Sequence, residues 1–542
     1  MDQPAQINTG ARTSSMKDDI VSGFLVFLIA LPLCLGIAMA SGFPPVGGIL
    51  TAAVGGIIST WLGSARLTIK GPAAGLIVIA LGAVTELGAE GGSGYRKALA
   101  TIVVASVIQI VFALVRAGAL GDIFPSSVVH GMLAAIGVII CSKQVHVALG
   151  VKPEAKEPLH LLLEIPHSLS ELNPEITFIG AVSLAILFAM PVLAKKFEFV
   201  KKIPAPLIVL AVSIPLAYVF DLEHEHTYSF SITHHDYKIG PSFLVNLPGN
   251  LLAAITTPDF SSVFSGTSIK YIVMFALVGS IESLLSAKAV DMLDPEKRSS
   301  NLDKDLLATG VGNLIAGFIG GLPMISEIVR SSANISYGAK TKLSNFFHGL
   351  FLLLFVAFLP GLIHRIPLAA LAAMLIFTGT RLASPTEFTK TYKIGPEQLV
   401  IFMTTMIVTI TTDLLVGVAA GLVMKMFIHL INGVPMAGLF KPAVEEIVDS
   451  ERVVLRVKHA AVFSNYLTIK KHIMKHADAK LVVVDFDDAR LVDHTVMEKL
   501  HEQEDLFKRA GRKLEICGLD GHKSLSAHPL AARKKGAVVT PT

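Results

Sequence analysis

The chain has 542 residues, of which 52% are hydrophobic and only 16% are charged, and its mean hydropathy is +0.63. A soluble protein of this size needs more charged surface, so the composition excludes an ordinary water-soluble protein. The small net charge of +4 does not indicate a nucleic-acid partner. The three cysteines, Cys34, Cys141 and Cys517, lie far apart, and their spacing indicates neither a disulfide framework nor a metal site.

Long apolar runs recur between residues 20 and 433. A run of about 18 or more apolar residues is typical of a helix that crosses a bilayer, so we predict a polytopic α-helical membrane domain over 20–433. About fourteen segments are expected, of which the third and the tenth are short and interrupted. The segments are predicted at 20–41, 45–63, 71–86, 98–116, 124–149, 177–194, 204–220, 268–290, 304–320, 326–338, 342–362, 366–381, 395–411 and 413–432.

Basic residues in short loops predict the orientation of this domain, because cytoplasmic loops carry an excess of lysine and arginine. With the N-terminal segment 1–19 in the cytoplasm, eight basic loop residues fall on that side: Lys195, Lys196, Lys201, Lys202, Lys297, Arg298, Lys340 and Lys342. We therefore predict a multi-pass protein of the cell membrane with both termini in the cytoplasm. Long loops at about 150–175 and 221–266 lie on the opposite side. The histidines of residues 221–236 are either solvated or, less commonly, ligands of a metal.

The third segment is interrupted by a lysine and a glycine–proline pair in the stretch RLTIKGPAAGLIVIALGAV, residues 66–84. Gly71 allows an unusual backbone angle, and Pro72 suits the first position of a helix. Pro323 and Ser326 hold the equivalent place before the tenth segment, where Ser326 is suited to cap the helix. A glycine-rich helix precedes each break, which is a weak internal repeat. Paired interruptions in two halves of a chain indicate the binding site of a transporter.

The two half-helices predict a site for an anion, because their free N–H groups and positive dipole ends face a shared point near the membrane midplane. A helix N-terminus contributes about 0.3–1 kcal/mol toward an anion, whereas desolvating an ion costs several kcal/mol. A fixed cation is therefore needed as well. Arg330, one turn into the tenth segment, meets this need best because its planar guanidinium suits oxyanions. The predicted substrate-binding residues are Lys70, Gly71, Pro72, Ala73, Ser326, Arg330 and Ser331.

Glu282, Ser286 and Glu327 are predicted to bind the coupling ion. An ionisable residue within a membrane span is costly and indicates a function by default. Glu282 and Ser286 share a face of the eighth segment, and Glu327 shares a face with Arg330. Acids beside an anion site are favourable if they take up a proton or a cation as the anion arrives. The structural alternatives are an ion pair between Glu327 and Arg330, a satisfied core position for Glu282, and a Lys70 side chain that extends to the cytoplasmic surface.

The sequence pattern changes after the membrane segments. Residues 434–450 are predicted to form a linker. Short buried strands in RVVLRV, KLVVVDF and KLEICGL then alternate with amphipathic helices in YLTIKKHIMKHA and HTVMEKLHEQEDLFKRAG. This alternation predicts a small α/β domain at 451–522. Residues 523–542 are basic, contain alanine and proline, and are predicted to form a disordered tail.

Over nearly its whole length the chain resembles the SulP sulfate-permease family of inorganic anion transporters. ALPLCLGIAMASGFPPVGGIL is similar to the family's first-helix signature, with Leu33 in place of the usual glutamine. IKGPAAGL is similar to the third-segment motif, although Lys70 is not the usual residue. SIESLLSAKA, GVGNLIAGFIGGLPM and VRSSANISYGAKTKLS are similar to the eighth, ninth and tenth segments. LVVVDFDDARLVDHTV is similar to the core of a STAS domain, with His494 where related proteins carry a phosphorylated serine.

The resemblance implies a seven-plus-seven inverted repeat, in which a core of segments 1–4 and 8–11 moves like an elevator against a gate of segments 5–7 and 12–14. It also implies a homodimer, a C-terminal STAS domain that binds cytosolic proteins, and a secondary active transporter rather than an enzyme. The substrate is of the sulfate or bicarbonate class, and no cofactor is expected beyond a coupling H⁺ or Na⁺.

Several alternatives stay open within the resemblance. Bicarbonate transporters of the family bind sodium with an aspartate of the eighth segment, and proton-coupled members typically carry a glutamate there. Glu282 therefore favours protons, and Ser286 leaves sodium open. The functional alternatives are an anion exchanger, a channel-like anion pathway, and a non-transporting scaffold or sensor that acts through its STAS domain.

Overall fold

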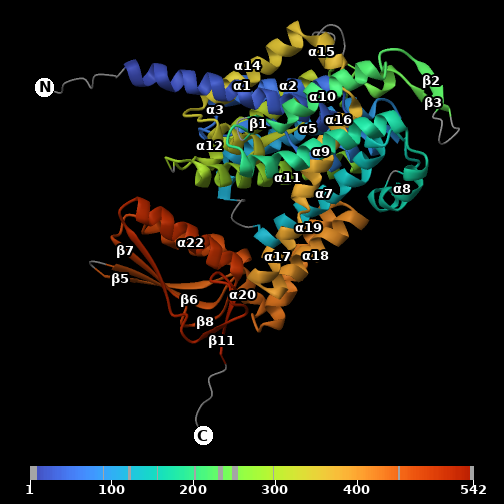
Figure 1. Cartoon of the computed structure of the whole chain (residues 1–542). Helices are drawn as coiled ribbons and strands as arrows, with labels where there is room; N and C mark the ends of the chain where they lie inside the picture. The colour runs from blue at the N-terminus through green and yellow to red at the C-terminus, as the bar shows by residue number, and fades with distance from the viewer. Residues whose placement is uncertain are drawn as a thin grey trace. The chain divides into compact units, whose positions relative to one another are not determined.

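The computed structural model describes residues 9–89, 91–119, 124–155, 157–200, 203–229, 236–246, 254–296, 298–449 and 452–536, with side chains from residue 16 onward. Lys201, Lys202, Lys297 and two of the loop histidines, His234 and His235, lie outside the described residues. The chain divides into two compact units (Figure 1). One comprises Met1–Gly118 and Ile136–Arg381, and the other comprises Ala119–Ala135 and Leu382–Thr542.

Eight helical spans among the described residues are long and apolar enough to cross a membrane. They are α1 (Thr9–Ala40), α2 with α3 (Pro45–Ile57, Ser59–Leu62), α5 (Gly94–Leu114), α7 (Ser126–Ala148), α9 (Pro174–Lys196), α11 (Gly266–Leu293), α16 with α17 (Leu368–Leu382, Pro385–Ile394) and α19 (Leu414–Ile431). Shorter apolar helices are η1 with α4 (Ala74–Leu76, Ile77–Ala89), α10 (Ala205–Val219), α14 (Leu343–Phe358) and α18 (Pro396–Thr411). With α12 (Leu302–Ile319) and α13 (Ile328–Ser336), every predicted segment contains a helix. The predicted polytopic α-helical fold class is confirmed.

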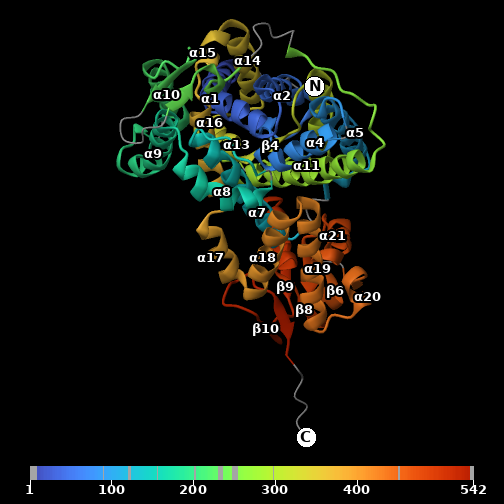
Figure 2. The same ribbon diagram turned by 90° about the vertical axis from the view of Figure 1, so that its right-hand side faces the viewer.

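In the first unit, helices that are distant in the sequence pack side by side, as the two views in Figures 1 and 2 show for α1, α2 and α14. Glycines allow the close approach. A Cβ atom added to Gly56 would lie 2.5 Å from the Cα atom of Gly349, and one added to Gly48 would lie 2.0 Å from the carbonyl oxygen of Cys34. Small residues at such contacts are typical of membrane helix packing. α2 also packs against β1 (Ile69–Pro72).

The long predicted loops contain regular structure of their own. α8 (Pro158–Ser170) lies in the first, and β2 (His226–Ser229) pairs with β3 (Asp236–Ile239) in the second. His224 contacts Asp221 at 2.7 Å between Nδ1 and Oδ1. In the part of the chain that the structure describes, no three histidine, cysteine or acidic side chains gather as a metal site would require.

The second unit contains a sheet with β6 at its centre. Its parallel strands are β6 (Arg452–Ala461), β7 (Leu481–Asp485), β8 (Ala489–Val492) and β9 (Lys513–Cys517), and its helices are α21 (Tyr466–Lys475) and α22 (His494–Arg509). Figure 1 shows α22 lying across one face of the sheet. The apolar residues of the strands and helices form one buried core. This is the small α/β fold that the alternating pattern predicts.

The predicted linker is part of this unit rather than a plain connection. α20 (Met436–Phe440) and β5 (Ala443–Val448) lie within residues 434–450, and β5 pairs antiparallel with β6 along six residues. β5 lies at an edge of the sheet and is largely exposed. Its sequence, Ala-Val-Glu-Glu-Ile-Val, therefore lacks the regular alternation of a half-buried strand, and the strand was not predicted. The second compact unit also includes α18 and α19, so its boundary differs from the predicted domain boundary.

The prediction of a disordered tail is wrong for its first part. β10 (His522–Ser524) pairs with β11 (Arg533–Lys535), and β11 pairs with β8. The basic side chains do not prevent this pairing, because the ladder uses backbone groups and the neighbouring Ala531 and Ala532 are buried. Residues 537–542 lie outside the described residues.

Candidate functional site

The two interruptions meet in a short antiparallel ribbon of two strands. β1 pairs with β4 (Met324–Glu327), and in this register Lys70 lies opposite Ser326 and Pro72 lies opposite Met324. β1 leads into η1 and α4, and β4 leads into α13. All four residues of β1 are buried. The ribbon therefore places the starts of both half-helices beside each other in the interior of the first unit.

Lys70 lies in a buried polar cluster on one side of the ribbon. Its Nζ atom is 2.8 Å from Oδ2 of Asp305, 2.9 Å from Oγ of Ser326 and 3.1 Å from Oγ1 of Thr309. An ammonium group has three donors, so all of them are used within the protein. Lys70 is 2% exposed, and the alternative in which it extends to the cytoplasmic surface is wrong. It has no donor left for an anion in this state.

The same cluster extends to α11 through Ser283. Its hydroxyl accepts a hydrogen bond of 3.1 Å from the N–H group of Ser326 and lies 3.2 Å from the hydroxyl of Thr309. The hydroxyl of Ser326 donates to Oδ2 of Asp305 at 3.0 Å, and Oδ1 of Asp305 has no partner among the described residues. The prediction that Ser326 caps the helix of the tenth segment, α13, is wrong. The N-cap position is Glu327, whose side chain makes no capping bond.

Arg330 lies on α13 and is 1% exposed. Its Nη1 atom is 3.5 Å from Sγ of Cys34, its Nη2 atom is 3.5 Å from the carbonyl oxygen of Pro72, and its Nε atom has no partner in the described part of the chain. Contacts of this length are weak hydrogen bonds at best. A Cβ atom added to Gly71 would lie 2.3 Å from Nη1. The guanidinium group is thus buried against the start of the third segment without a strong partner.

Two carboxylates lie at the starts of the half-helices, with Glu327 within electrostatic reach of Arg330 and Glu282 within reach of Glu327. Oε2 of Glu282 and Oε1 of Glu327 are buried and have no partner among the described residues. Glu327 accepts a hydrogen bond from the N–H group of Ala74, and a Cβ atom added to Gly75 would lie 2.0 Å from Oε1 of Glu282. Oε2 of Glu282 is thus left without a described partner, and the hydrogen bonds that the structure gives Arg330 go to a thiol and a carbonyl group, although its charge also acts on Glu327.

The remaining predicted residues divide between support and site. The hydroxyl of Ser331 accepts a hydrogen bond of 2.8 Å from the N–H group of Ile69, and the N–H group of Ala73 donates to the carbonyl oxygen of Pro323 at 3.4 Å. Both contacts fix the ribbon. Ser286 is half-buried, one turn beyond Glu282, whereas Ser283 is the α11 serine that joins the polar cluster.

Sequence reasoning missed Asp305, Thr309, Ser283 and His348. His348, on α14, is fully buried, and both of its ring nitrogens lack a partner among the described residues. It lies close enough to Arg330 for the two to interact electrostatically. The sequence did indicate that Asp305 and Thr309 lie together, because they are four residues apart and share a helix face. The partners of Asp305 on β1 and β4 could not be seen from that spacing.

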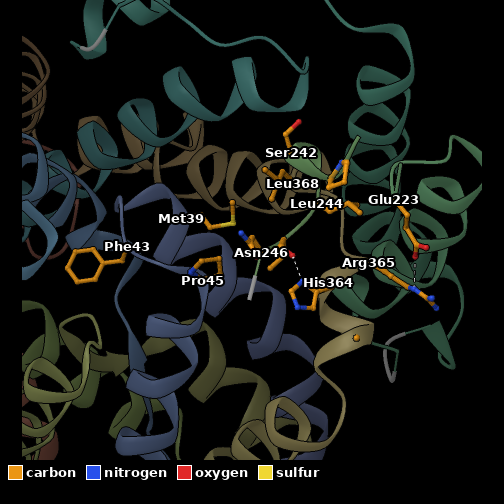
Figure 3. Close-up of a pocket in the computed structure, with 13 residues that line it drawn as sticks. Met39, Phe43, Pro45, Glu223, Ser242, Leu244, Asn246, His364, Arg365 and Leu368 are labelled. Atoms are coloured by element: carbon orange, nitrogen blue, oxygen red, sulfur yellow. Dashed lines mark hydrogen bonds and ion pairs between the residues drawn. The ribbon is translucent and has the colours of Figure 1, made fainter. Parts of the chain in front are cut away.

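A separate cavity of about 770 Å³ opens in the first unit (Figure 3). It is lined by Met39, Phe43, Pro45, Glu223, Pro241, Ser242, Leu244, Val245, Asn246, Gly361, His364, Arg365 and Leu368. Its arginine is already paired, with Nε of Arg365 lying 2.8 Å from Oε1 of Glu223 on the surface. No predicted site residue lines this cavity. The buried side chains of Lys70 and Arg330 lie at the ribbon instead.

Comparisons with known proteins find a family and relatives that span most of the chain. The family model described as the sulfate permease family matches residues 16–405, which include both strands and Arg330. "Putative sulfate transporter YvdB" of Bacillus subtilis is 25% identical over 531 residues, covering 96% of this chain and 94% of that protein. "Bicarbonate transporter BicA" of Picosynechococcus sp. is 25% identical over 419 residues, covering 77% and 70%. The solved structure of SLC26A9 aligns with a TM-score of 0.65 at 13% identity, covering 93% and 85%.

Proposed function

The chain belongs to the sulfate permease family, and we propose that it is a secondary active transporter of a small inorganic anion of the sulfate or bicarbonate class. The names of its relatives support this substrate class. The observation that carries the proposal is the guanidinium group of Arg330, which is buried and whose hydrogen bonds within the described residues are two contacts of 3.5 Å. A buried cation without strong protein partners is suited to receive an anion.

In this proposal the anion lies where η1 and α13 begin. Arg330 provides the charge, and the backbone of Gly71, Pro72 and Ala73 with the first turn of α13 provides N–H groups and a positive dipole end. Two charges 4 Å apart gain about 4 kcal/mol at an effective dielectric constant of about 20. That gain is comparable to the several kcal/mol needed to desolvate an ion. Ser326 and Ser331 act by holding the ribbon.

Coupling is assigned to Glu282, with Glu327 as a second candidate. The two carboxylates repel each other, and both would repel an anion held by Arg330. Uptake of a proton removes one negative charge, so proton and anion binding favour each other. This supports symport. A sodium ion bound by Glu282 and Ser286 would have the same effect on the charge.

The cellular setting follows from the sequence and the family. We place the protein in the cell membrane as a homodimer, with both termini in the cytoplasm, and with an α/β domain of the STAS type that is available to cytosolic proteins. During transport the core segments move like an elevator against the gate. The excess of basic residues in one set of loops supports the orientation.

The test is uptake of radiolabelled sulfate and bicarbonate into proteoliposomes under imposed proton or sodium gradients. The wild-type protein should accumulate at least one of these anions, and Arg330→Ala should lose saturable uptake while it still purifies as a folded protein. Arg330→Lys should rescue uptake only in part, because an ammonium group lacks the bidentate geometry of guanidinium. Arg381→Ala is the control, since Arg381 is exposed.

The outcomes separate the competing functions. Normal uptake by folded Arg330→Ala would show that the site is assigned wrongly. Uptake that requires an anion on the opposite side of the membrane would identify an exchanger, and uptake that does not saturate would identify a channel-like pathway. If the wild-type protein moves no anion under any gradient, the remaining function is that of a scaffold or sensor.

A further inference from the structure

Two sets of polar groups lie around the ribbon, and the first encloses its cation in short hydrogen bonds, whereas the second does not. In the first set, Lys70 and Ser326 meet Asp305, Thr309 and Ser283, and every ammonium hydrogen finds an oxygen. The second set comprises Arg330, Glu282 and Glu327, each with at least one buried nitrogen or oxygen that lacks a partner in the described part of the chain. The second set is the proposed substrate and coupling site. Of the first set, only Ser326 has a role in that proposal, where it holds the ribbon.

The oxygens around Lys70 resemble the ligand set of a small hard cation. One carboxylate oxygen and two hydroxyl oxygens lie 2.8–3.1 Å from Nζ, and the hydroxyl of Ser283 completes the group beside Thr309. Sodium, like other hard cations, takes carboxylate, hydroxyl and carbonyl oxygens. The ammonium group of Lys70 occupies the centre of this arrangement. Lys70 and Asp305 are 2% and 1% exposed, so a solvent ion does not share the place.

We propose that Lys70 supplies a cation tethered to the protein, which takes the place of a sodium ion at the core of the transporter. The inference rests on the proposed function and goes beyond it, since it assigns a reason for coupling to protons rather than sodium. Two features connect Lys70 to the coupling site: Ser283 follows Glu282 in the sequence, and Ser326 precedes Glu327.

The hydroxyls of Ser283 and Ser326 are the polar oxygens next to these glutamates along the chain. Both are committed to the Lys70 cluster. Glu282 then has only Ser286 of its own helix as a further predicted oxygen ligand, and the two together provide fewer oxygens than such a cation needs. The fixed positive charge of Lys70 also repels a second cation placed next to it. Glu282 is therefore left to bind a proton, and uptake should not depend on sodium.

The ammonium group of Lys70 also lies on the strand that leads to the proposed anion site. Lys70 directly precedes Gly71, against which the guanidinium of Arg330 packs. The ion pair with Asp305 joins β1 to α12 across 235 residues of sequence. Removal of the ammonium group should therefore leave a cation site in the position that fixes the ribbon. A sodium ion that entered it would restore both the charge and the geometry.

The experiment compares Lys70→Ala with Lys70→Met in purified protein. Alanine leaves space for an ion beside Asp305, whereas methionine fills that space with an apolar chain of similar length. The melting temperature of Lys70→Ala should rise by roughly 2 °C or more when sodium chloride replaces choline chloride, because a ligand that binds only the folded state stabilises it. The melting temperatures of the wild-type protein and of Lys70→Met should not respond. Anion uptake by Lys70→Ala should become sodium-stimulated, and wild-type uptake should be equal in both salts.

Two results would overturn the inference: a sodium requirement for wild-type uptake, or a Lys70→Ala protein that responds to sodium no more than Lys70→Met. The double variant Lys70→Ala with Asp305→Asn should lose any sodium response, because it removes the carboxylate ligand. If Lys70→Ala cannot be purified in either salt, the sodium dependence of wild-type uptake decides. If the wild-type protein transports nothing, the proposed function fails, and the melting temperatures still decide on Lys70.

Discussion

Glu282 and Glu327 present a problem at the scale of single residues, because a carboxylate beside Arg330 competes with the anion. Each glutamate keeps one buried oxygen without a partner in the described chain. A buried acceptor without a hydrogen bond costs about 1–3 kcal/mol, and a charged one costs more. A protonated carboxyl group has a lower desolvation cost and no longer repels the substrate. The arrangement therefore favours the protonated form when an anion is bound.

We expect Glu282→Gln to keep anion binding and anion exchange but to lose uphill uptake driven by a pH gradient. Glutamine has the shape of the protonated acid and cannot release a proton, so the coupling step is lost while the site stays neutral. The measurement is sulfate and bicarbonate uptake in proteoliposomes with and without an imposed pH gradient. Glu86→Gln is the matched control, because Glu86 is exposed and pairs with Lys270 on the surface. Full gradient-driven uptake by Glu282→Gln would show that this acid is structural.

We expect Gly71→Ala to raise the KM for the anion at least severalfold with little loss of stability. The added methyl group would meet Nη1 of Arg330 at 2.3 Å, and the end of a flexible side chain can move away from it. The guanidinium then leaves its place against the ribbon, and substrate contacts weaken. Gly266→Ala is the control, since a Cβ atom there meets nothing within 4 Å. Equal KM values for the two variants would contradict the placement of the site.

Single residues also show where sequence reasoning stops. Arg330, Glu282 and Glu327 could be predicted because a charge within a membrane span is costly. The partner of Lys70 could not be predicted, because Asp305 is 235 residues away and stands near the start of a predicted segment, where an acid is common. The sequence therefore left Lys70 as either a substrate ligand or a surface residue, and the fold shows a third arrangement, a buried ion pair with Asp305.

At the scale of elements, the unpredicted feature is the strand pair β1–β4. The sequence did not predict these strands for two reasons. Four residues that include a Gly-Pro pair are not typical of a strand, and open sheet edges do not occur in the lipid-facing parts of membrane proteins. The pair forms here because the ribbon is buried inside the protein, where helices cover both strands. The half-helices themselves could be predicted from Gly71, Pro72 and Pro323, since these residues act locally on the backbone.

We expect Ser331→Ala to destabilise the ribbon by about 1–3 kcal/mol, because the buried N–H group of Ile69 then loses its acceptor. The measurement is thermal unfolding of the purified protein, with anion uptake recorded on the same sample. Ser336→Ala is the control on the same helix, since Ser336 is exposed and bonds only to the preceding turn. An unchanged melting temperature for Ser331→Ala would mean that the ribbon is held by other contacts.

The second unit contains its own buried ion pair between elements. Nζ of Lys425 on α19 lies 3.3 Å from Oδ2 of Asp493, and the two side chains are 0% and 1% exposed. Asp493 also caps α22 through the N–H group of Val496. Burial raises the pKa of Asp493, but Lys425, His429 and these hydrogen bonds outweigh burial, so the pKa lies below its ordinary value of 3.8.

We expect Asp493→Asn to lower the stability of this unit by about 3–5 kcal/mol, because asparagine keeps the cap but leaves the ammonium of Lys425 buried without a counter-charge. Adding Lys425→Met should recover most of the loss. Since the pKa of Asp493 is lowered, its contribution is full above pH 3.8 and is lost as the pH falls below that value. Thermal unfolding at neutral and acidic pH tests both statements. A difference between wild type and variant that persists at low pH would contradict them.

At the scale of the whole molecule, every proposed site residue belongs to the first compact unit, and the Lys425–Asp493 pair belongs to the second. The sequence predicted a helical part followed by an α/β part, because apolar runs and α/β alternation are patterns of whole segments. It misplaced the edges of the α/β domain, because β5 and β11 join the sheet through backbone pairing that their side chains do not reveal.

We therefore expect deletion of residues 440–542 to leave the affinity for the anion within about twofold of the full chain, while the melting temperature falls. The affinity is kept because Arg330, Glu282 and the ribbon lie outside the deleted part. The stability falls because α19 loses its contacts with the α/β domain, among them those of Lys425 and His429 with Asp493. Radiolabelled sulfate and bicarbonate binding in detergent measures the affinity, with the truncation carrying Arg330→Ala as the blank. A truncated protein that stays folded but binds neither anion would place part of the site in the α/β domain.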